Sequence, residues 1–347
     1  MPSSEVDVSV LATFDEGTIY DCITSVMALR HDGPLNVRIR EQGGNDTQHA
    51  LIQQAIAEAA PNPARTVVVT RGDNVGFAVG HNIAMRAGTG ELVLLVNADA
   101  DLDPHFLDAA VPHFADPTVG AIQGKLTRPS EEAGGAPDID TLGFVVDRKR
   151  RFLPRGMGET DLGQYDEVVE VFGADGAVPL YRRRALDDVA VPRMTPPDPD
   201  QLEYFDESFF IYKEDVDLAW RLSARGWRTM YVPSATASHV RTLRRGVGGG
   251  ALAVMAQRRK NPSRAKYLSF SNHRVMQVKL ERVGPLLRDI VPWLSFELLQ
   301  WGAVLVTERM GLRTFGRFLR MTPLAMRKRR WIRRNRPATG DPYAWFR

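Results

Sequence analysis

The first hundred residues alternate between short apolar runs with strand periodicity and longer segments with helical periodicity. Four runs have the length and alternation of strands: Val6–Thr13, Leu35–Arg40, Thr66–Thr70 and Glu91–Val96. Three segments between them have helical spacing: Thr18–Leu29, Gln48–Ala60 and Phe77–Ala87. This order is typical of βαβ units and predicts an α/β fold with a doubly wound, Rossmann-like sheet. Ligands of such sheets bind beyond the carboxyl ends of the strands.

The second part of the chain is less regular. Val191–Gln201 contains four prolines and is predicted to be a loop. Glu214–Arg225 has helical spacing of its apolar residues and ends before Gly226, a typical C-cap. Gly246–Gly250 breaks the pattern, and we expect the main domain boundary there, between residues 1–245 and residues 246–347.

The longest apolar stretch, Ile290–Thr307, has nearly the length of a membrane span. Pro292, Glu297 and Gln300 interrupt it, which favours a buried or interfacial helix over a transmembrane one. The N-terminal residues contain neither a basic segment nor a long apolar one, so no secretory signal is predicted. We expect a cytoplasmic protein that lies peripherally on the inner face of the cell membrane.

Charge is distributed unevenly along the chain, although the net charge over 347 residues is only +3. Residues 1–240 contain 21 Lys and Arg against 37 Asp and Glu, a net charge of −16. Residues 241–347 contain 24 against 5, a net charge of +19. The chain is therefore an acidic body followed by a strongly basic region. The single cysteine, Cys22, excludes an intrachain disulfide and a cysteine cluster for zinc or iron.

A cluster of carboxylates directly follows the fourth predicted strand. Asp99, Asp101 and Asp103 alternate there with apolar residues. Carboxylates at a strand end can converge on a hard divalent cation, which prefers oxygen ligands. The alternative is an acidic loop that caps the next helix, and Asp103, followed by Pro104, has the sequence of an N-cap. We expect the metal role for Asp99 and the capping role for Asp103.

A second group of carboxylates lies around the predicted helix start at Glu214. Aromatic residues flank Asp206 and Glu207, and Asp215 and Asp217 follow Glu214 closely. An acidic residue at a helix N-terminus is commonly a cap that the helix dipole stabilises. Three carboxylates in four residues exceed what capping needs, and a desolvated carboxylate beside aromatic rings can serve as a general base.

Two further segments have weaker signals. The glycines between Arg71 and Asn82 lie between a strand and a helix, but their spacing fits neither the dinucleotide fingerprint nor a Walker loop. His239 follows a predicted strand and precedes Arg241, so it is either a structural histidine or part of a polyanion site. The sequence contains no G-x-S-x-G nucleophile elbow.

In their order and spacing, these segments resemble the family 2 glycosyltransferases of the GT-A fold, and within them the rhamnosyltransferase-like branch of cell-surface polysaccharide synthesis. Four motifs carry the resemblance: Thr13-Phe14-Asp15; Asn74, Gly76, Phe77, Ala78, Gly80 and Asn82 of an N-x-G-F-A-x-G-x-N segment; Asn97-Ala98-Asp99; and F-D-E-x-F-F-x-x-x-E-D-x-D-L-x-x-R-x-x-x-x-G-W from Phe205 to Trp227. A Tyr-Val-Pro strand and His239 follow. The resemblance covers residues 5–245 and implies a mixed sheet of the GT-A type.

The resemblance also implies roles for the motif residues. Asp99 and His239 would hold Mg²⁺ or Mn²⁺ on the donor diphosphate, with Asp101 as a further candidate ligand. Asp215 would be the general base, and Glu214 and Asp217 would orient and cap. The nucleotide-sugar donor would contact residues from several turns: Thr13, Asp15, Glu41, Asn74, Gly80, Asn97 and Arg241. The turn Glu41–Asp46 departs from the family's acidic D-N-x-S-x-D turn, which leaves the nucleotide preference open.

The region after Gly250 interleaves arginine with Phe, Leu, Met and Trp, most densely in Arg313–Arg336. Basic segments of this kind bind nucleic acid, form solvated faces or lie on anionic membranes. The leucine and aromatic content favours the membrane surface, so we expect no nucleic-acid partner. Residues 246–347 are therefore predicted to form a basic, amphipathic helical region that associates with an anionic membrane.

The favoured function is inverting, metal-dependent transfer of rhamnose from dTDP-rhamnose to a lipid-linked (polyprenyl-diphosphate) saccharide acceptor in cell-wall or surface polysaccharide synthesis. A UDP-hexose donor used by the same residues is the alternative within this class. A non-catalytic protein that binds nucleotides or nucleic acid is the alternative from another class. The adjacent Glu214 and Asp215 argue against the non-catalytic alternative.

Overall fold

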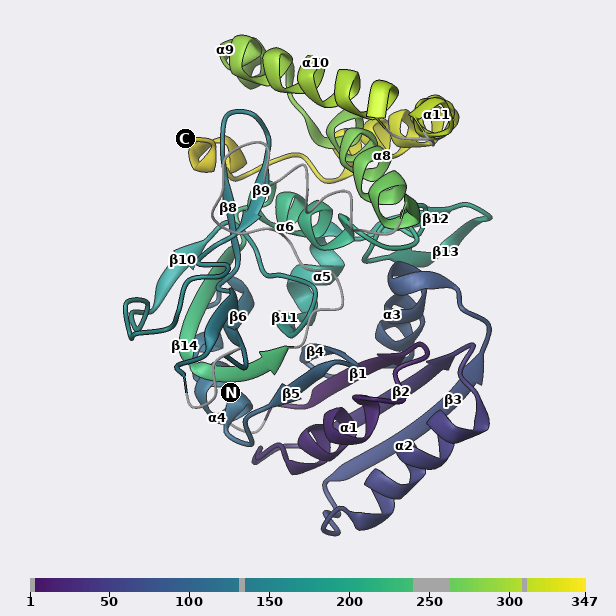
Figure 1. Ribbon diagram of the computed structural model, residues 1–347, viewed down its shortest axis with the longest axis vertical. Helices are drawn as coiled ribbons and strands as arrows, with labels where there is room; N and C mark the ends of the chain where they lie inside the picture. The colour runs from purple at the N-terminus through teal and green to yellow at the C-terminus, as the bar shows by residue number, and fades with distance from the viewer. Residues whose placement is uncertain (1–3, 131–134, 240–262, 308–310) are drawn as a thin grey trace.

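The computed structural model describes residues 4–130, 135–239, 263–307 and 311–347 (Figure 1). A ten-stranded mixed sheet lies at its centre, and eight of its strands follow one another in the order β10, β14, β6, β11, β4, β1, β2, β3. In chain order these are β1 (Val6–Ala12), β2 (Leu35–Gln42), β3 (Arg65–Gly72), β4 (Leu92–Asn97), β6 (Val119–Arg128), β10 (Val169–Val171), β11 (Pro179–Arg182) and β14 (Arg228–His239). Two short strands extend the sheet: β5 (Ala100–Leu102) pairs with β14, and β7 (Asp138–Thr141) pairs with β6.

The strand directions explain the sequence pattern. β1 to β4 are parallel, as the βαβ reading predicts. β11 lies antiparallel between β4 and β6, and β14 runs parallel to β6. The predicted α/β fold with a mixed sheet is confirmed. Strand β4 is an uninterrupted apolar run because both faces of the sheet are covered at its centre.

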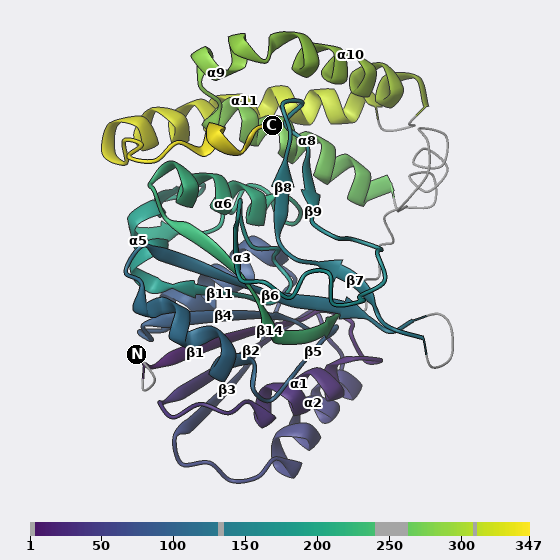
Figure 2. The ribbon, with the colours of Figure 1, turned by 90° about the vertical axis from the view of Figure 1, so that its left-hand side faces the viewer.

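Helices cover both faces of the sheet (Figures 1 and 2). On one face α1 (Ile19–Ala28), α2 (Asp46–Glu58) and α4 (Phe106–Ala110), with the 3-10 helix η1 (Val111–Ala115), contribute to the main core. On the other face α3 (Gly76–Ala87), α5 (Arg183–Val189) and α6 (Glu214–Ala224) form a second core. The hairpin of β8 (Phe144–Val146) and β9 (Phe152–Pro154) stands beside α6.

The C-terminal helices stack above α6, at the end of the molecule opposite α2 (Figures 1 and 2). They are α8 (Ser263–Leu280), α9 (Val283–Arg288), α10 (Ile290–Thr307) and α11 (Gly311–Asn335), followed by the 3-10 helix η2 (Pro342–Trp345). Trp220 of α6 is buried in a cluster with Met276 of α8, Ala325 of α11 and Phe346 near the end of the chain. The C-terminal helices therefore share a hydrophobic core with the sheet domain.

The prediction that Val191–Gln201 is a loop is wrong. This segment contributes to a hairpin of β12 (Val191–Met194) and β13 (Pro197–Glu203), which forms a two-stranded sheet of its own. Each strand of a two-stranded sheet is an edge strand, so its proline positions can face outward, where no backbone N–H is needed.

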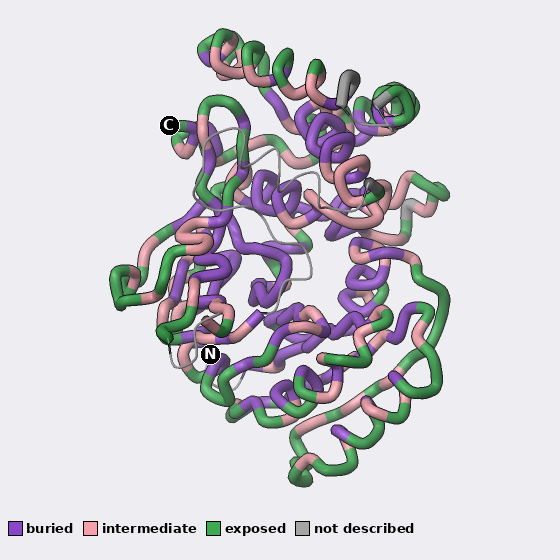
Figure 3. Tube along the Cα trace, viewed as in Figure 1, coloured by how far each residue is buried: buried purple, intermediate pink, exposed green. Residues whose placement is uncertain are grey.

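Helix α10 has the bounds of the apolar stretch seen in the sequence, but its outer side is not buried. Val291, Leu294 and Leu298 are 76%, 43% and 65% exposed. Figure 3 shows the outer turns of α9 and α10 as the exposed rim of the helical layer. Within the described part of the chain, no helix has the length and apolar character needed to span a membrane.

Candidate active site

Asp99 and His239 meet at one edge of the sheet. Asp99 follows β4, and the pairing of β14 with β5 places His239 opposite Ala100. The Nε2 atom of His239 lies 3.1 Å from Oδ1 of Asp99, and its Nδ1 atom lies 2.9 Å from Oδ2 of Asp140. Sequence reasoning missed Asp140, because β7 reaches the site only through its long-range pairing with β6. The structure thus brings the two predicted metal ligands together and adds a carboxylate behind the histidine.

The chemistry of this pair fits a divalent cation. Burial opposes the charged imidazolium, but the hydrogen bonds with Asp140 and Asp99 raise the pKa of His239 to about 9. A carboxylate on Nδ1 orients the ring and leaves Nε2 facing Asp99, as is usual for ligating histidines. Because only a neutral imidazole binds a metal, a cation would take the place of the proton on Nε2. The carboxylate oxygen of Asp99 is a ligand typical of Mg²⁺ or Mn²⁺. Because the described ranges hold no group of three or more side chains placed to bind one metal ion, further ligands would come from a bound phosphate and water.

Asp101 and Asp103 do not join this pair. Asp101 is exposed on β5, where burial and the charge of Asp21 on α1 raise its pKa and a hydrogen bond with Ser25 lowers it. Asp101 therefore lies beside α1. Asp103 accepts a hydrogen bond from the backbone N–H of His105 at 2.8 Å, in the turn before α4. The predicted N-cap at Asp103 is wrong, because α4 begins later, with His105 as its N-cap and no side-chain capping hydrogen bond.

Glu214 and Asp215 form the first turn of α6. Asp215 accepts hydrogen bonds from the backbone N–H groups of Val216 (2.7 Å) and Gly176 (3.3 Å). Burial, followed by the charge of Asp175, raises the pKa of Asp215. Burial, followed by the charge of Asp215, raises the pKa of Glu214 to about 8. At pH 7 Glu214 therefore keeps its proton.

A short path of contacts joins the two carboxylate sites. The backbone N–H of Asn97, at the end of β4, donates to the carbonyl oxygen of Ala177 at 2.9 Å. Ala177 directly follows Gly176, which contacts Asp215. Asn97 in turn lies two residues before Asp99. The candidate metal site and the candidate base are thus held by the same pair of turns.

Thr13 and Asp15 lie in the turn after β1. The backbone N–H of Thr13 donates to Oδ2 of Asp15, and the N–H of Asp15 donates to Oε1 of Gln48 at 3.0 Å. Burial raises the pKa of Asp15 to about 6, and the nearby charge of Asp99 contributes to the rise. This turn therefore belongs to the same edge of the sheet as Asp99.

Glu41 is a buried residue at the end of β2. Its Oε1 lies 2.6 Å from Nδ1 of His49, and its Oε2 lies 3.7 Å from Nε of Arg71. The rest of the unusual turn has a structural role, because Asn45 caps α2 by accepting a hydrogen bond from the N–H of Gln48 at 2.9 Å.

Asn74, Gly80 and Arg241 complete the predicted donor contacts. Oδ1 of Asn74 accepts a hydrogen bond from the N–H of Gly76 at 3.0 Å, which shapes the turn before α3. A Cβ on Gly80 would lie 2.9 Å from a methyl group of Leu11, so this glycine allows α3 to pack closely on β1. Arg241 lies outside the described residues.

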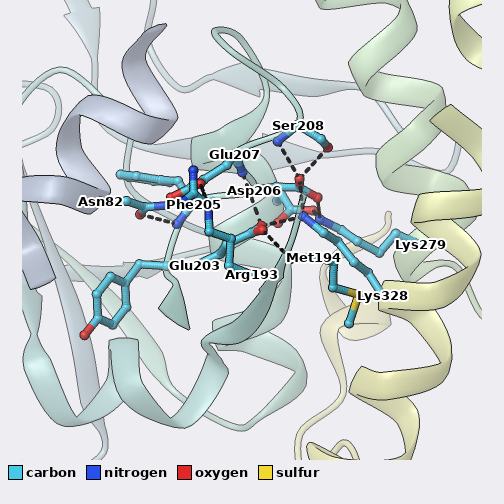
Figure 4. Close-up of polar contacts among 12 residues, drawn as sticks. Asn82, Arg193, Met194, Glu203, Phe205, Asp206, Glu207, Ser208, Lys279 and Lys328 are labelled. Atoms are coloured by element: carbon cyan, nitrogen blue, oxygen red, sulfur yellow. Dashed lines mark hydrogen bonds and ion pairs between the residues drawn. The ribbon is translucent and has the colours of Figure 1, made fainter. Parts of the chain in front are cut away.

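Asp206 of the F-D-E segment lies in a buried ion cluster with lysines of the C-terminal helices (Figure 4). Lys279 of α8 pairs with Asp206 and, at 2.6 Å, with Asp217 of α6. Lys328 of α11 pairs with Asp206 at 2.7 Å and with Glu203. All five side chains are at least nine-tenths buried. These carboxylates attach the C-terminal helices to the sheet domain, a role that the sequence did not indicate.

Comparison with known proteins identifies the family. The sequence model described as glycosyltransferase like family 2 matches residues 6–262. An N-acetylglucosaminyltransferase of Azorhizobium caulinodans is 24% identical over 239 residues, which are 67% of this chain and 54% of that protein. An N-acetylglucosaminyl-diphospho-decaprenol L-rhamnosyltransferase of Mycobacterium tuberculosis is 28% identical over 258 residues, 66% of this chain and 74% of that protein. The chain thus spans about half the length of the first relative.

Solved structures share the fold. S. aureus TarS 1-349 in complex with UDP-GlcNAc has a TM-score of 0.53 and 14% identity, covering 93% of this chain and 83% of that one. GalNAc-T7 with UDP, GalNAc and Mn²⁺ has a TM-score of 0.51 and 11% identity, covering 80% of this chain and 49% of that one. Because the family model matches well over half of the chain, this protein belongs to glycosyltransferase family 2 and has the GT-A fold.

Proposed function

We propose that the protein is an inverting, metal-dependent glycosyltransferase that transfers rhamnose from dTDP-rhamnose to a lipid-linked (polyprenyl-diphosphate) saccharide. One observation carries this proposal: the partly buried carboxylate of Asp215 and the Asp99–His239 pair are held by the same two turns. The first can accept a proton from an attacking hydroxyl. The second can hold a cation where a diphosphate departs.

In the proposed reaction Asp215 takes the proton of the acceptor hydroxyl. The acceptor oxygen attacks the anomeric carbon from the face opposite the diphosphate, and the bond from that carbon to the diphosphate breaks with its electron pair leaving on the nucleoside diphosphate. The configuration at the anomeric carbon is thereby inverted. Burial, which raises the pKa of Asp215, makes it a stronger base. Asp99 and His239 would hold Mg²⁺ or Mn²⁺, which neutralises charge on the leaving group when bound.

Two relatives support different donors. The mycobacterial relative is named as a rhamnosyltransferase that acts on a decaprenol-linked acceptor, which supports the favoured donor and acceptor. The Azorhizobium relative is named as an N-acetylglucosaminyltransferase, and TarS was solved with UDP-GlcNAc, which favours a UDP-hexose as the second candidate.

The experiment that separates these donors measures nucleoside diphosphate release and product formation. Purified protein with Mn²⁺ and a synthetic polyprenyl-diphosphate-linked GlcNAc receives dTDP-rhamnose or UDP-GlcNAc. Release from dTDP-rhamnose alone is expected, with a rhamnosylated lipid as the product. Release from UDP-GlcNAc alone selects the second candidate, and release from neither contradicts both.

The C-terminal helices support a membrane-associated acceptor. Exposed apolar residues recur every three or four positions along α9 and α10: Val283, Leu287, Val291, Leu294 and Leu298. On α11, Leu312, Phe315 and Leu319 are also exposed, beside the exposed Arg313 and Arg320. An apolar stripe flanked by arginine matches an anionic membrane, which offers both hydrocarbon and negative charge. We place the protein on the inner face of the cell membrane on this basis.

A further inference from the structure

Three residues of the loop that precedes the catalytic carboxylates have positive φ angles. The values are +68° at Phe210, +73° at Tyr212 and +78° at Lys213. Such conformations are unfavourable in residues other than glycine and persist only where the surroundings impose them. Since Lys213 directly precedes Glu214, the loop of residues 209–213 determines where α6 begins and where Asp215 lies.

Asn272 of α8 binds this loop from the side of the C-terminal helices. Its side chain is fully buried. Its Nδ2 donates to the carbonyl oxygens of Phe209 (3.0 Å), Ile211 (3.0 Å) and Tyr212 (2.8 Å). The two N–H bonds of one amide group therefore serve three backbone acceptors of an irregular, strained segment, with one hydrogen shared between two carbonyl oxygens.

Arg317 of α11 fixes the orientation of that amide. Its Nη1 donates to Oδ1 of Asn272 at 2.7 Å and to Oγ of Ser271 at 2.9 Å, and its Nη2 donates to the carbonyl oxygen of Ser208 at 3.1 Å. Because a guanidinium can only donate, Asn272 must present its oxygen to Arg317 and its NH₂ group to the loop.

The other side of the loop packs against α3. The carbonyl oxygen of Phe210 accepts a hydrogen bond from the N–H of Ala78 at 3.3 Å. A Cβ on Gly76 would lie only 2.5 Å from the same oxygen, so the close approach requires glycine there. The loop thus lies between α3 and α8 and forms hydrogen bonds with both helices. Helix α3 follows the proposed donor-binding turn.

We propose that Asn272, oriented by Arg317, is a positioning residue for Asp215: it holds the loop of residues 209–213 so that the carboxylate stays aligned with the acceptor hydroxyl. The kinetic part of this inference rests on the proposed function. The structural part, that Asn272 holds the loop, stands without it.

The test compares Asn272→Ala with Gln277→Ala. Gln277 is also a buried amide of α8, but its Nε2 contacts His273 at 3.0 Å and not the loop. Amide hydrogen exchange of residues 209–216 is measured in both variants, together with kcat and the donor KM for dTDP-rhamnose in Mn²⁺. For Asn272→Ala we expect faster exchange and a kcat lower by on the order of 10- to 100-fold, with an unchanged donor KM. Gln277→Ala should change neither.

A third variant isolates the donated hydrogen bonds. Asn272→Asp keeps an oxygen for Arg317 but cannot donate to the loop, so it should behave like Asn272→Ala. Unchanged exchange in Asn272→Ala, or faster exchange with unchanged kcat, would overturn the proposal. Because hydrogen exchange needs no substrate, faster loop exchange in a protein that transfers no sugar supports the contact and counts against the proposed function alone.

Discussion

Two aspartates of the segment from Phe205 to Trp227, Asp206 and Asp215, lie in opposite electrostatic environments. Burial disfavours the charge of both. Around Asp206 the ammonium groups of Lys279 and Lys328 outweigh burial and hold its pKa well below the ordinary value. Around Asp215 the charge of Asp175 adds to burial, and the pKa rises. Carboxylates paired with buried lysines fasten the C-terminal helices, whereas Asp215, with its raised pKa, is the carboxylate that we propose accepts a proton.

The basic residues of the C-terminal helices also fall into two groups: those paired with buried carboxylates and those exposed on the surface. Lys279 and Lys328 face inward and neutralise carboxylates of the acidic body. Arg313 and Arg320 face outward beside exposed apolar side chains. The opposite net charges of the two parts of the chain therefore contribute to cohesion on one side of the helices and, as we propose, to membrane attachment on the other.

Removing the charge of Asp215 tests the catalytic side of the contrast and has the largest expected effect. In Asp215→Asn, kcat should fall by about 10²–10⁴-fold, since a general base contributes that much. Nucleoside diphosphate binding, measured by thermal shift with dTDP and Mn²⁺, should remain. The unfolding midpoint in urea should not fall, because the raised pKa of Asp215 means that its surroundings disfavour the charge that the substitution removes. Wild-type turnover in this variant would refute the role of Asp215.

Removing Lys279, a buried cation paired with carboxylates, should instead destabilise the fold. Lys279→Met leaves Asp206 short of one partner and removes the ammonium that faces Asp217, and breaking a buried ion pair costs about 3–5 kcal/mol. Urea unfolding measures this loss. The control is Lys266→Met on the same helix, because Lys266 is only half-buried and lies in no ion pair among the described residues. Equal stability of the two variants would mean that the cluster does not fasten the helices.

The candidate metal site can be tested by comparing two carboxylates close together in the sequence, Asp99 and Asp101. Asp99→Ala should remove the increase in dTDP affinity that Mn²⁺ produces, because Asp99 faces His239. A loss of at least about 10-fold in metal affinity is expected, the lower bound for disturbing even a supporting group of a metal site. Asp101→Ala should retain the metal effect, since Asp101 faces α1. Calorimetric titration with dTDP, with and without Mn²⁺, separates the two, and the reverse outcome would reassign the ligand.

The outward-facing arginines should have the smallest individual effects. Arg313→Gln and Arg320→Gln should each weaken binding to phosphatidylglycerol vesicles by about 1 kcal/mol, roughly fivefold, as measured by sedimentation. Arg30→Gln, at an exposed arginine in the loop after α1, is the control. Point substitutions are preferable to truncation at Arg313, because Lys328 belongs to the buried cluster. If both variants sediment like the unmodified protein, the membrane proposal fails.

Local sequence patterns identified much of the fold and some of the candidate site. The order of strands and helices followed from periodicity, and the positions of Asp99 and Asp215 followed from their places after an apolar strand and at a helix start. The hairpin at residues 191–203 was missed, because proline content is a local signal and pairing of the two strands is not. The close packing of Gly80 between α3 and β1 was not evident from the sequence, and its donor contact stays a prediction.

Sequence alone determined which chemical groups the protein possesses and where the main elements begin and end, since both depend on residue type and short-range spacing. The tertiary structure decided which carboxylates have cationic partners. Asp140, Lys279 and Asn272 become important only through contacts with residues 60 to 100 positions away. Burial magnifies each such contact, because a charge or polar group removed from water depends on the few partners that the fold places beside it.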